Sequence, residues 1–286
     1  MYIPVDINSA VAKECKRRRY SIQTAESYLY WINRFLKQNK KELGKISKKE
    51  VREFLEGLDD KNLAGNTMNV AHMAIKFLFE DVMRRKIWID IKYSKVPRRI
   101  QRVLSKEEIN ILIKAIANNQ HRLIIALMYS AGLRVSEVVN LKIKDLEIER
   151  GYGFVRGGKG GKDRLFIISK RLEIALEQKC LNRGKEEYLF LTNRKNKYSI
   201  RSLQQIIKKA AKKSEISDWK EIHCHTLRHS FATHLIEQGQ SVAEVQSLLG
   251  HKSPETSMSY IHKSGQMIKI KSPFDFNLNG TTNKKY

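Results

Sequence analysis

The sequence predicts a mainly helical protein with a small β-sheet, divided into two domains. Apolar residues recur at helical spacing through most of the chain, whereas short β-branched runs alternate with polar residues between Ile143 and Ile168. A basic stretch around Pro97 interrupts the helical periodicity. The chain length of 286 residues also exceeds the usual size of a single domain.

The first domain, expected over residues 1–92, consists of helices alone. Its first apolar stripe is formed by Tyr28, Trp31, Ile32, Phe35 and Leu36. A second helix begins at Ser47, where Glu50 completes a capping box. A third begins near Thr67, and its apolar face consists of Val70, Met73, Phe77 and Leu78. No cluster of catalytic side chains appears in this domain.

Residues 93–104 form a predicted basic linker, which is either a solvated connection or a segment that crosses a phosphate backbone. The second domain covers residues 105–272, and a polar tail follows over residues 273–286. The second domain begins at Ser105, where another capping box predicts a helix start.

The rest of the second domain is predicted from its apolar runs. After helices that end at Gly132, strands are expected at Ile143–Ile148, Phe154–Val155 and Leu165–Ile168, with a glycine-rich hairpin tip before the last. Helices return after Ser199 and continue to about Tyr260. One of them begins at a capping box of Ser241 and Glu244 and ends at Gly250. Its predicted core face consists of Val242, Val245, Leu248 and Leu249.

Composition indicates a polyanionic partner and excludes several classes of protein. The chain has 55 Lys and Arg against 30 Asp and Glu, a net charge of +25. No apolar run is long enough to span a membrane, and no secretory signal is visible. The three cysteines, Cys15, Cys180 and Cys224, lie too far apart in the sequence for a disulfide framework or a zinc ribbon. This favours a cytoplasmic location.

Two arginine clusters are candidates for binding phosphate. His225 and Arg228 share one helix face, so an imidazole and a guanidinium could contact the same phosphate. Arg134 and Glu137 share a turn, where the carboxylate could orient a second guanidinium. The alternatives are an ordinary histidine on a basic helix and an exposed ion pair.

Three further residues could take part in catalysis. His251 follows a helix end at Gly250, and Tyr260 lies on a short helix expected to begin at Ser253–Pro254. Tyr260 could be a nucleophile or a core tyrosine. Lys159, on the glycine-rich tip, could donate a proton or be a solvated lysine.

In order along the chain, these residues resemble the motifs of the tyrosine recombinases, or phage-type integrases, and especially Xer-type members of bacteria and archaea. The matching segments are Ala131–Glu137, Gly158–Gly160, His225–His234 and Leu248–His251 leading to Tyr260. The lead-in Ser257–Ser259 differs from the family's threonine-rich sequence. The resemblance covers the whole chain and implies a helical, SAM-like core-binding domain before a mixed α/β catalytic domain.

The resemblance also implies the chemistry. Tyr260 would attack a DNA phosphate, forming a 3′-phosphotyrosyl bond and releasing a 5′-hydroxyl, with no metal or other cofactor. Arg134 and Arg228 would neutralise the phosphate charge, supported by Glu137, while His225 and His251 add hydrogen bonds. Lys159 would protonate the leaving oxygen, and His225 would hold or accept the proton of Tyr260.

The implied partners are double-stranded DNA recombination sites, two of which would be held by a homotetramer; the free protein would be a monomer or dimer. The implied role is chromosome-dimer resolution, with integration or inversion of a mobile element as the alternative. Other classes stay open: a type IB topoisomerase-like enzyme, a non-catalytic architectural DNA-binding protein, and a metal-dependent nuclease whose ligands would be His223, His225, His229 and His234.

Overall fold

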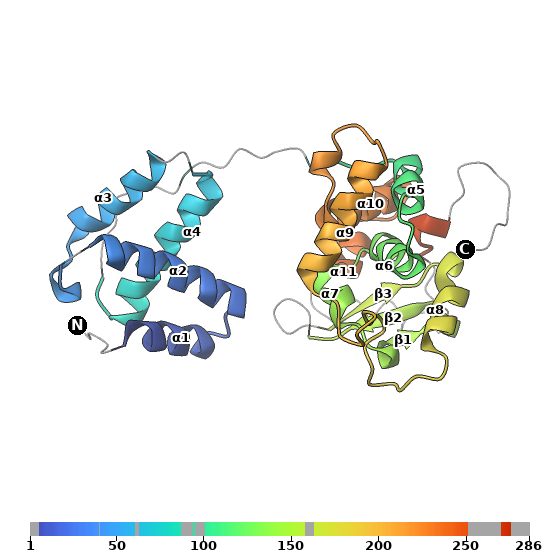
Figure 1. Ribbon diagram of the computed structural model, residues 1–286, viewed down its shortest axis with the longest axis horizontal. Coiled ribbons are helices and arrows are strands. Elements are labelled where there is room, and N and C mark those ends of the chain that lie inside the picture. Colours follow the sequence, from blue (N-terminus) through green and yellow to red (C-terminus); the bar gives the residue numbers. More distant parts are fainter. Residues whose placement is uncertain are drawn as a thin grey trace. The chain divides into compact units, whose positions relative to one another are not determined.

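The computed structural model describes residues 6–39, 41–60, 63–86, 94, 101–157, 163–250 and 270–275. The chain forms two compact units, Met1–Arg99 and Ile100–Tyr286 (Figure 1). Each unit has its own buried apolar core. The predicted combination of many helices with one small sheet is confirmed.

The first unit is helical throughout its described residues. Its elements are α1 (Ile7–Arg17), α2 (Ile22–Gln38), η1 (Leu43–Lys45), α3 (Lys48–Asp59), α4 (Gly65–Lys76) and the π-helix η2 (Phe77–Val82), which continues α4. Helix α2 packs against both α1 and α4 and buries Trp31, Ile32 and Phe35, as its apolar stripe predicts. The capping box of Ser47 and Glu50 is present at the start of α3.

Two features of this unit differ from the prediction. Helix α1 was not expected, although Asp6 caps it through the backbone N–H groups of Asn8 and Ser9. Met73, assigned to the core, is 40% exposed. The inward face of α4 is centred on Ala71, Ala74 and Ile75, and a residue two positions from Ala71 lies on the other side of the helix.

The second unit contains seven α-helices among its described residues, and a small sheet. The helices are α5 (Lys106–Lys114), α6 (Asn119–Ser130), α7 (Val135–Asn140), α8 (Glu173–Cys180), α9 (Ile200–Lys213), α10 (Cys224–Glu237) and α11 (Val242–Leu248). Short 3-10 turns are η3 (Ile143–Asp145), η4 (Ile148–Arg150), η5 (Lys170–Leu172), η6 (Trp219–Glu221) and η7 (Pro273–Asp275).

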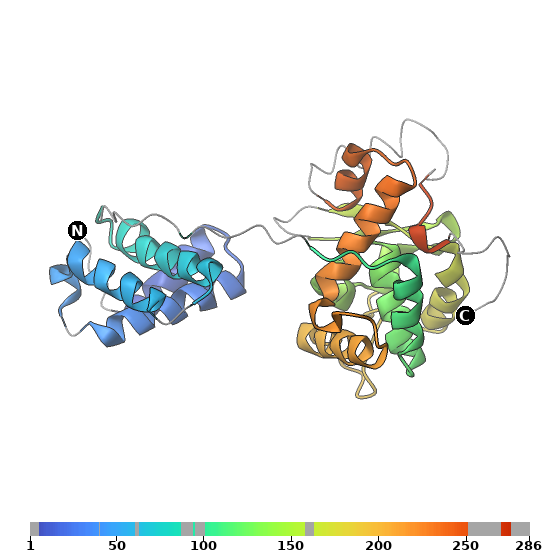
Figure 2. The same ribbon diagram turned by 90° about the horizontal axis from the view of Figure 1, so that it is seen from above.

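Helix α6 lies at the centre of the second unit. It packs against α5, α7 and α10, and every residue from Ile124 to Ser130 is buried. Figure 2 shows α5 and α6 beside α9 and α10. The predicted capping boxes at Ser105 and Ser241 are present. Val242, assigned to the core face of α11, is exposed because the helix turns its Val245 and Leu248 inward instead.

The sheet is antiparallel, in the order β1 (Leu146–Glu147), β2 (Tyr152–Val155), β3 (Arg164–Ile167). Helix α11 packs against β3. The two later strands agree with the prediction, but a full strand over Ile143–Ile148 is wrong. The Asp145 carboxylate accepts a hydrogen bond from the backbone N–H of Lys142 (2.9 Å), which closes a 3-10 turn and leaves only two residues for β1.

Described residues near both ends of the second unit pack on its core. Leu104 is buried, and its N–H donates to Ser230 Oγ (2.9 Å), so this end of the expected linker packs on the second unit. At the other end, Phe274 is 3% exposed, and the Ser272 hydroxyl donates to the carbonyl of Ser130 (2.7 Å). The first residues of the expected polar tail are therefore part of this core.

Candidate active site

The turn between α6 and α7 brings Arg134 to a helix start. Gly132 has φ +59°, and a Cβ there would lie 2.4 Å from the Phe231 ring, so the turn requires glycine. Arg134 is the N-cap residue of α7, and its backbone N–H donates to Glu137 Oε2 (2.7 Å). The Arg134 guanidinium donates to Glu137 Oε1 (2.8 Å), so both ends of this residue are held by one carboxylate.

Helix α10 supplies His225 and Arg228. His225 is exposed, whereas Arg228 is buried and donates to the carbonyls of Gly132 (2.6 Å) and Leu249. Arg228 Nη1 also lies 3.7 Å from Glu137 Oε2. These contacts join the Arg134 turn, α10 and the end of α11, and they bring the two predicted phosphate-binding arginines to the same carboxylate.

Glu137 therefore lies at the centre of the site. Burial raises the pKa of its carboxyl group, but the charge and hydrogen bonds of Arg164 and the backbone N–H of Arg134 outweigh burial and hold the pKa at about 2. Burial and the nearby cations of Arg164 and Arg134 lower the pKa of Arg228 to about 9. A bound anion would relieve the repulsion among these guanidinium groups.

The sequence reasoning missed Arg164, the first residue of β3. Its Nη2 donates to Glu137 Oε2 (2.7 Å), and its Nη1 donates to the carbonyl of Leu248. The signal was present in the sequence, because a charged residue directly precedes the apolar run Leu165–Ile168. A charged side chain at the edge of a buried strand needs a partner, and that partner is Glu137.

Lys159, His251 and Tyr260 lie outside the described residues, but the segments that lead to two of them are described. On the hairpin, the Gly157 N–H donates to the Asp163 carboxylate (2.8 Å), which pairs the ends of the tip that carries Lys159. After α11, Gly250 has φ +72°, which only glycine adopts without strain. The residue expected at this helix end, His251, follows directly.

The histidines of the nuclease hypothesis do not share one environment. His234 is buried, and its Nδ1 is hydrogen-bonded to the Tyr129 hydroxyl (2.8 Å), whereas His223 and His225 are exposed. Among the residues that the structure describes, no group of three or more His, Cys, Asp or Glu side chains is arranged to hold a metal ion.

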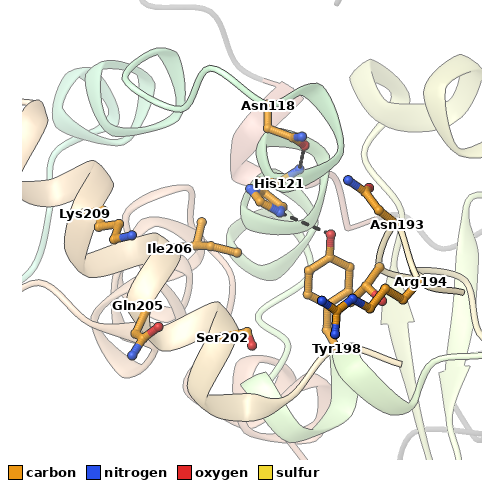
Figure 3. A pocket seen from close by; sticks show the side chains of 10 residues that line it. Asn118, His121, Asn193, Arg194, Tyr198, Ser202, Gln205, Ile206 and Lys209 are labelled. Carbon is orange, nitrogen blue, oxygen red and sulfur yellow. Dashed lines mark hydrogen bonds between the residues drawn. The ribbon is translucent and has the colours of Figure 1, made fainter. Parts of the chain in front are cut away.

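A polar pocket of about 480 Å³ lies elsewhere in the second unit, between α6, α9 and the loop before α9 (Figure 3). His121 and Tyr198 are hydrogen-bonded across it (3.1 Å), and Arg194 and Lys209 contribute positive charge. None of the described candidate catalytic residues lines this pocket.

The fold and the motifs define a DNA-breaking and rejoining enzyme, and the comparisons give its family. The chain belongs to the phage integrase family: the family's sequence profile matches residues 102–267, and that of the phage integrase N-terminal SAM-like domain matches residues 8–89. The protein is thus a tyrosine recombinase, which acts in site-specific DNA recombination, and its first unit has the SAM-like fold that the resemblance predicted.

Curated relatives and solved structures agree with this assignment. Tyrosine recombinase XerA of Thermococcus kodakarensis is 35% identical over 251 residues, covering 84% of this chain and 84% of that protein. The XerA of Pyrococcus horikoshii is 33% identical over 244 residues, covering 84% and 83%. The Tn1549 transposon integrase, solved with a circular intermediate DNA, has the same fold, with a TM-score of 0.69 at 18% identity over 90% of this chain and 95% of that one.

No helix within the described ranges is both long enough and apolar enough to cross a membrane.

Proposed function

We propose that this recombinase cuts DNA with Tyr260 and neutralises the scissile phosphate with Arg134 and Arg228. Attack by the Tyr260 hydroxyl oxygen on phosphorus forms a 3′-phosphotyrosyl bond and breaks the bond to the 5′-oxygen. Lys159 gives that oxygen a proton, and His225 accepts the tyrosine proton. His251 adds a hydrogen bond to the phosphate, and Glu137 orients the arginines.

The convergence of Arg134 and Arg228 on Glu137 carries this proposal. The two arginines come from separate motifs, yet their guanidinium nitrogens lie 2.8 and 3.7 Å from oxygens of one carboxylate. Two guanidinium forks around a single acidic group leave a net positive charge for a phosphate. Guanidinium forks bind phosphate oxygens in pairs, which the point charge of a lysine cannot do.

A trapped covalent adduct tests the assignment of the nucleophile. With a nicked duplex that loses a short oligonucleotide after cleavage, religation is prevented and the protein stays attached to DNA. Peptide mapping should find the phosphate on Tyr260, and Tyr260→Phe should bind the duplex without forming the adduct. A phosphate on Tyr198 or any other residue would contradict the proposal.

The same assay separates this chemistry from that of a metal-dependent nuclease. Here the nucleophile is a tyrosine and the counter-charges are side chains, so cleavage should proceed at an unchanged rate in excess chelator. Loss of activity that zinc or manganese restores would favour the histidine cluster instead. A protein that binds but never cleaves would be an architectural one.

We further propose that the protein resolves chromosome dimers in the cytoplasm, acting as a tetramer on two DNA sites. This role is supported by the archaeal XerA relatives, which are matched over most of their length. Structural relatives of low identity include a λ integrase tetramer bound to a Holliday junction. Mobile-element integration is the second candidate, because a putative integrase/recombinase of Sinorhizobium fredii is 31% identical over 276 residues.

Mapping covalent protein–DNA adducts across the source genome separates the two roles. For dimer resolution, adducts are expected at a single chromosomal site. Loss of the gene should then leave chromosome dimers unresolved. Adducts at the ends of a mobile element would favour integration.

A further inference from the structure

Arg164 is a charged side chain in an apolar setting. It is 5% exposed and begins β3, and the strand residues that follow it are all buried: Leu165, Phe166 and Ile167. An arginine removed from water in this way destabilises the fold unless its charge and its N–H groups are matched by partners. The identity of those partners therefore indicates what the residue does.

The Arg164 guanidinium joins segments that carry separate recombinase motifs. Nη2 and Nε donate to the two oxygens of Glu137 (2.7 and 3.4 Å), and Nη1 donates to the carbonyl of Leu248 at the end of α11. Its aliphatic part fills the space beside Gly250, where a Cβ would lie 2.7 Å from Arg164 Cδ. One side chain thus links β3, the turn of Arg134 and the end of α11.

This arrangement uses up the hydrogen-bonding capacity of Glu137. Each carboxylate oxygen accepts one bond from Arg134 (2.8 and 2.7 Å) and one from Arg164. Arg228 is left at 3.7 Å from the carboxylate, and its hydrogen bonds go to the carbonyls of Gly132 and Leu249. Without Arg164, Glu137 would have unfilled lone pairs near Arg228, the one of its three neighbouring arginines that is not already hydrogen-bonded to it.

We propose that Arg164 is a positioning residue for cleavage, which keeps Glu137 occupied so that Arg134 and Arg228 remain oriented toward DNA phosphate. This inference rests on the phosphate-binding role proposed above for those two arginines. Three guanidinium groups around one carboxylate give a net charge of +2. Loss of Arg164 lowers that charge to +1 and lets Glu137 draw Arg228 away from the substrate.

The effect should fall on the chemical step rather than on DNA binding. A phosphodiester carries one negative charge, and the five-coordinate state formed by the attack of an oxyanion carries two. Interactions that strengthen as charge develops accelerate the reaction, whereas those already made in the bound complex do not. DNA affinity depends on many phosphate contacts, and Arg164 is buried away from them.

Single-turnover cleavage of the nicked duplex, at saturating protein, tests this proposal. Arg164→Met should slow cleavage about 10- to 100-fold, by analogy with the cost of removing the outer-shell partners that orient metal ligands. The dissociation constant for DNA should change by less than about threefold, since the phosphate contacts remain. Arg164→Lys, which keeps the charge but not the fork, should be intermediate. If Arg164→Met unfolds the unit, Arg164→Lys carries the remaining measurements.

Arg183→Met is the matched control. Arg183 is an arginine of the second unit that is less buried than Arg164; it donates to the backbone carbonyls of Lys179, Tyr188 and Leu189 and pairs with Glu187 (3.1 Å). It contacts none of the candidate catalytic residues that the structure describes. Its loss should lower stability and leave the cleavage rate near that of the wild type.

Two readouts separate positioning from a general loss of structure. A methylphosphonate at the scissile position carries one negative charge less than the natural phosphodiester. The loss of cleavage rate in Arg164→Met, relative to the wild type, should therefore be smaller on methylphosphonate DNA. A general structural defect would slow cleavage of both linkages by the same factor. The double variant Arg164→Met/Glu137→Gln should be no slower than the slower single variant, because both act through one contact.

The inference would be overturned if Arg164→Met cleaved DNA at the wild-type rate. If only Arg164→Lys folds, a wild-type cleavage rate in that variant would have the same meaning. Equal deficits on both linkages, or rate losses that multiply with Glu137→Gln, would overturn it as well. Failure of the proposed function looks different: the wild type would form no adduct, or Arg228→Ala would cleave as fast as the wild type.

Discussion

At the scale of single residues, this site depends on arginine side chains that each make several directed contacts. Arg228 holds the carbonyls of Gly132 and Leu249 with separate nitrogens while its charge stays beside Glu137. Lysine has one nitrogen and cannot make such contacts together. The geometry of the guanidinium group, and not its charge alone, therefore holds the end of α11 against the turn after α6.

Arg228→Lys should consequently impair cleavage far more than DNA binding. Loss of one directed donor to a charged reaction intermediate costs roughly 2.7 to 4 kcal/mol, or about 100- to 1000-fold in rate. The measurement is single-turnover cleavage alongside the DNA dissociation constant. Arg183→Lys, remote from the site, is the control and should cleave normally. Near wild-type cleavage by Arg228→Lys would contradict the argument.

Glu137 should make stability depend on pH in the acidic range. Its folded pKa is held at about 2, below the usual value of 4.5, so its contribution is fully present above pH 4.5 and is lost as the pH falls toward 2. The full contribution is on the order of 3 kcal/mol. Urea unfolding at several pH values should show Glu137→Gln less stable than the wild type at pH 6, with a smaller difference at pH 3. A difference independent of pH would contradict this linkage.

At the scale of elements, α11 is a short helix whose last carbonyls organise the site. It spans Val242–Leu248, and the carbonyls of Leu248 and Leu249 accept hydrogen bonds from Arg164 and Arg228. Isolated helices of this length are unstable in water, so α11 depends on packing and on its capping box at Ser241. The capping interaction therefore supports the position of the acceptor carbonyls.

Ser241→Ala should lower the free energy of unfolding by about 1 kcal/mol, because the cap loses its side-chain acceptor for the Glu244 N–H. Ser241→Asp keeps an acceptor at the same position and is the matched variant; it should stay close to the wild type. Urea unfolding followed by circular dichroism measures both. Equal losses in the two variants would show that the loss does not come from the missing acceptor.

At the scale of the whole molecule, the last described segment bears on how subunits are linked. After Tyr260 the sequence keeps several apolar residues, which predict that the C-terminal segment docks into a neighbouring catalytic domain, with packing on its own domain as the alternative: Met267, Ile268, Ile270, Phe274 and Phe276. The described residues 270–275 pack on their own unit: Phe274 lies against Tyr129, with ring centroids 5.9 Å apart, and below the Arg171 guanidinium (4.4 Å). That the rest of the C-terminal segment docks onto a neighbouring subunit stays a prediction.

Truncation after Gly265 should abolish cooperative binding and strand exchange between two duplexes. The shortened chain also loses Phe274, so the full-length variant Phe274→Leu is the control: it removes the ring contacts and keeps an apolar side chain. Strand exchange is expected in the control and not in the truncated protein. Wild-type strand exchange and cooperative binding by the truncated protein would exclude a linking role for the segment.

Local sequence patterns determined much of the fold and the composition of the site. The capping boxes at Ser47, Ser105 and Ser241 are present because each depends on groups within four residues along the chain. Four motifs, those around Arg134 and Arg228 among them, identified the family, because residue types suited to binding a phosphate follow one another in a fixed order. The sequence thereby determined the class of reaction.

Tertiary structure alone decided how these residues meet. Arg164 looked like the polar edge of a strand, and only its contact with Glu137, far away in the sequence, makes it part of the site. The buried face containing Met73 was wrong because packing partners, and not local apolar content, decide which face of a helix turns inward. The expected strand at Ile143–Ile148 was wrong for a local reason, because the Asp145 carboxylate closes a 3-10 turn. The spacing of apolar residues predicts the strand or helix on which a residue lies. For Arg164, the need to compensate its buried charge decides that it contacts Glu137.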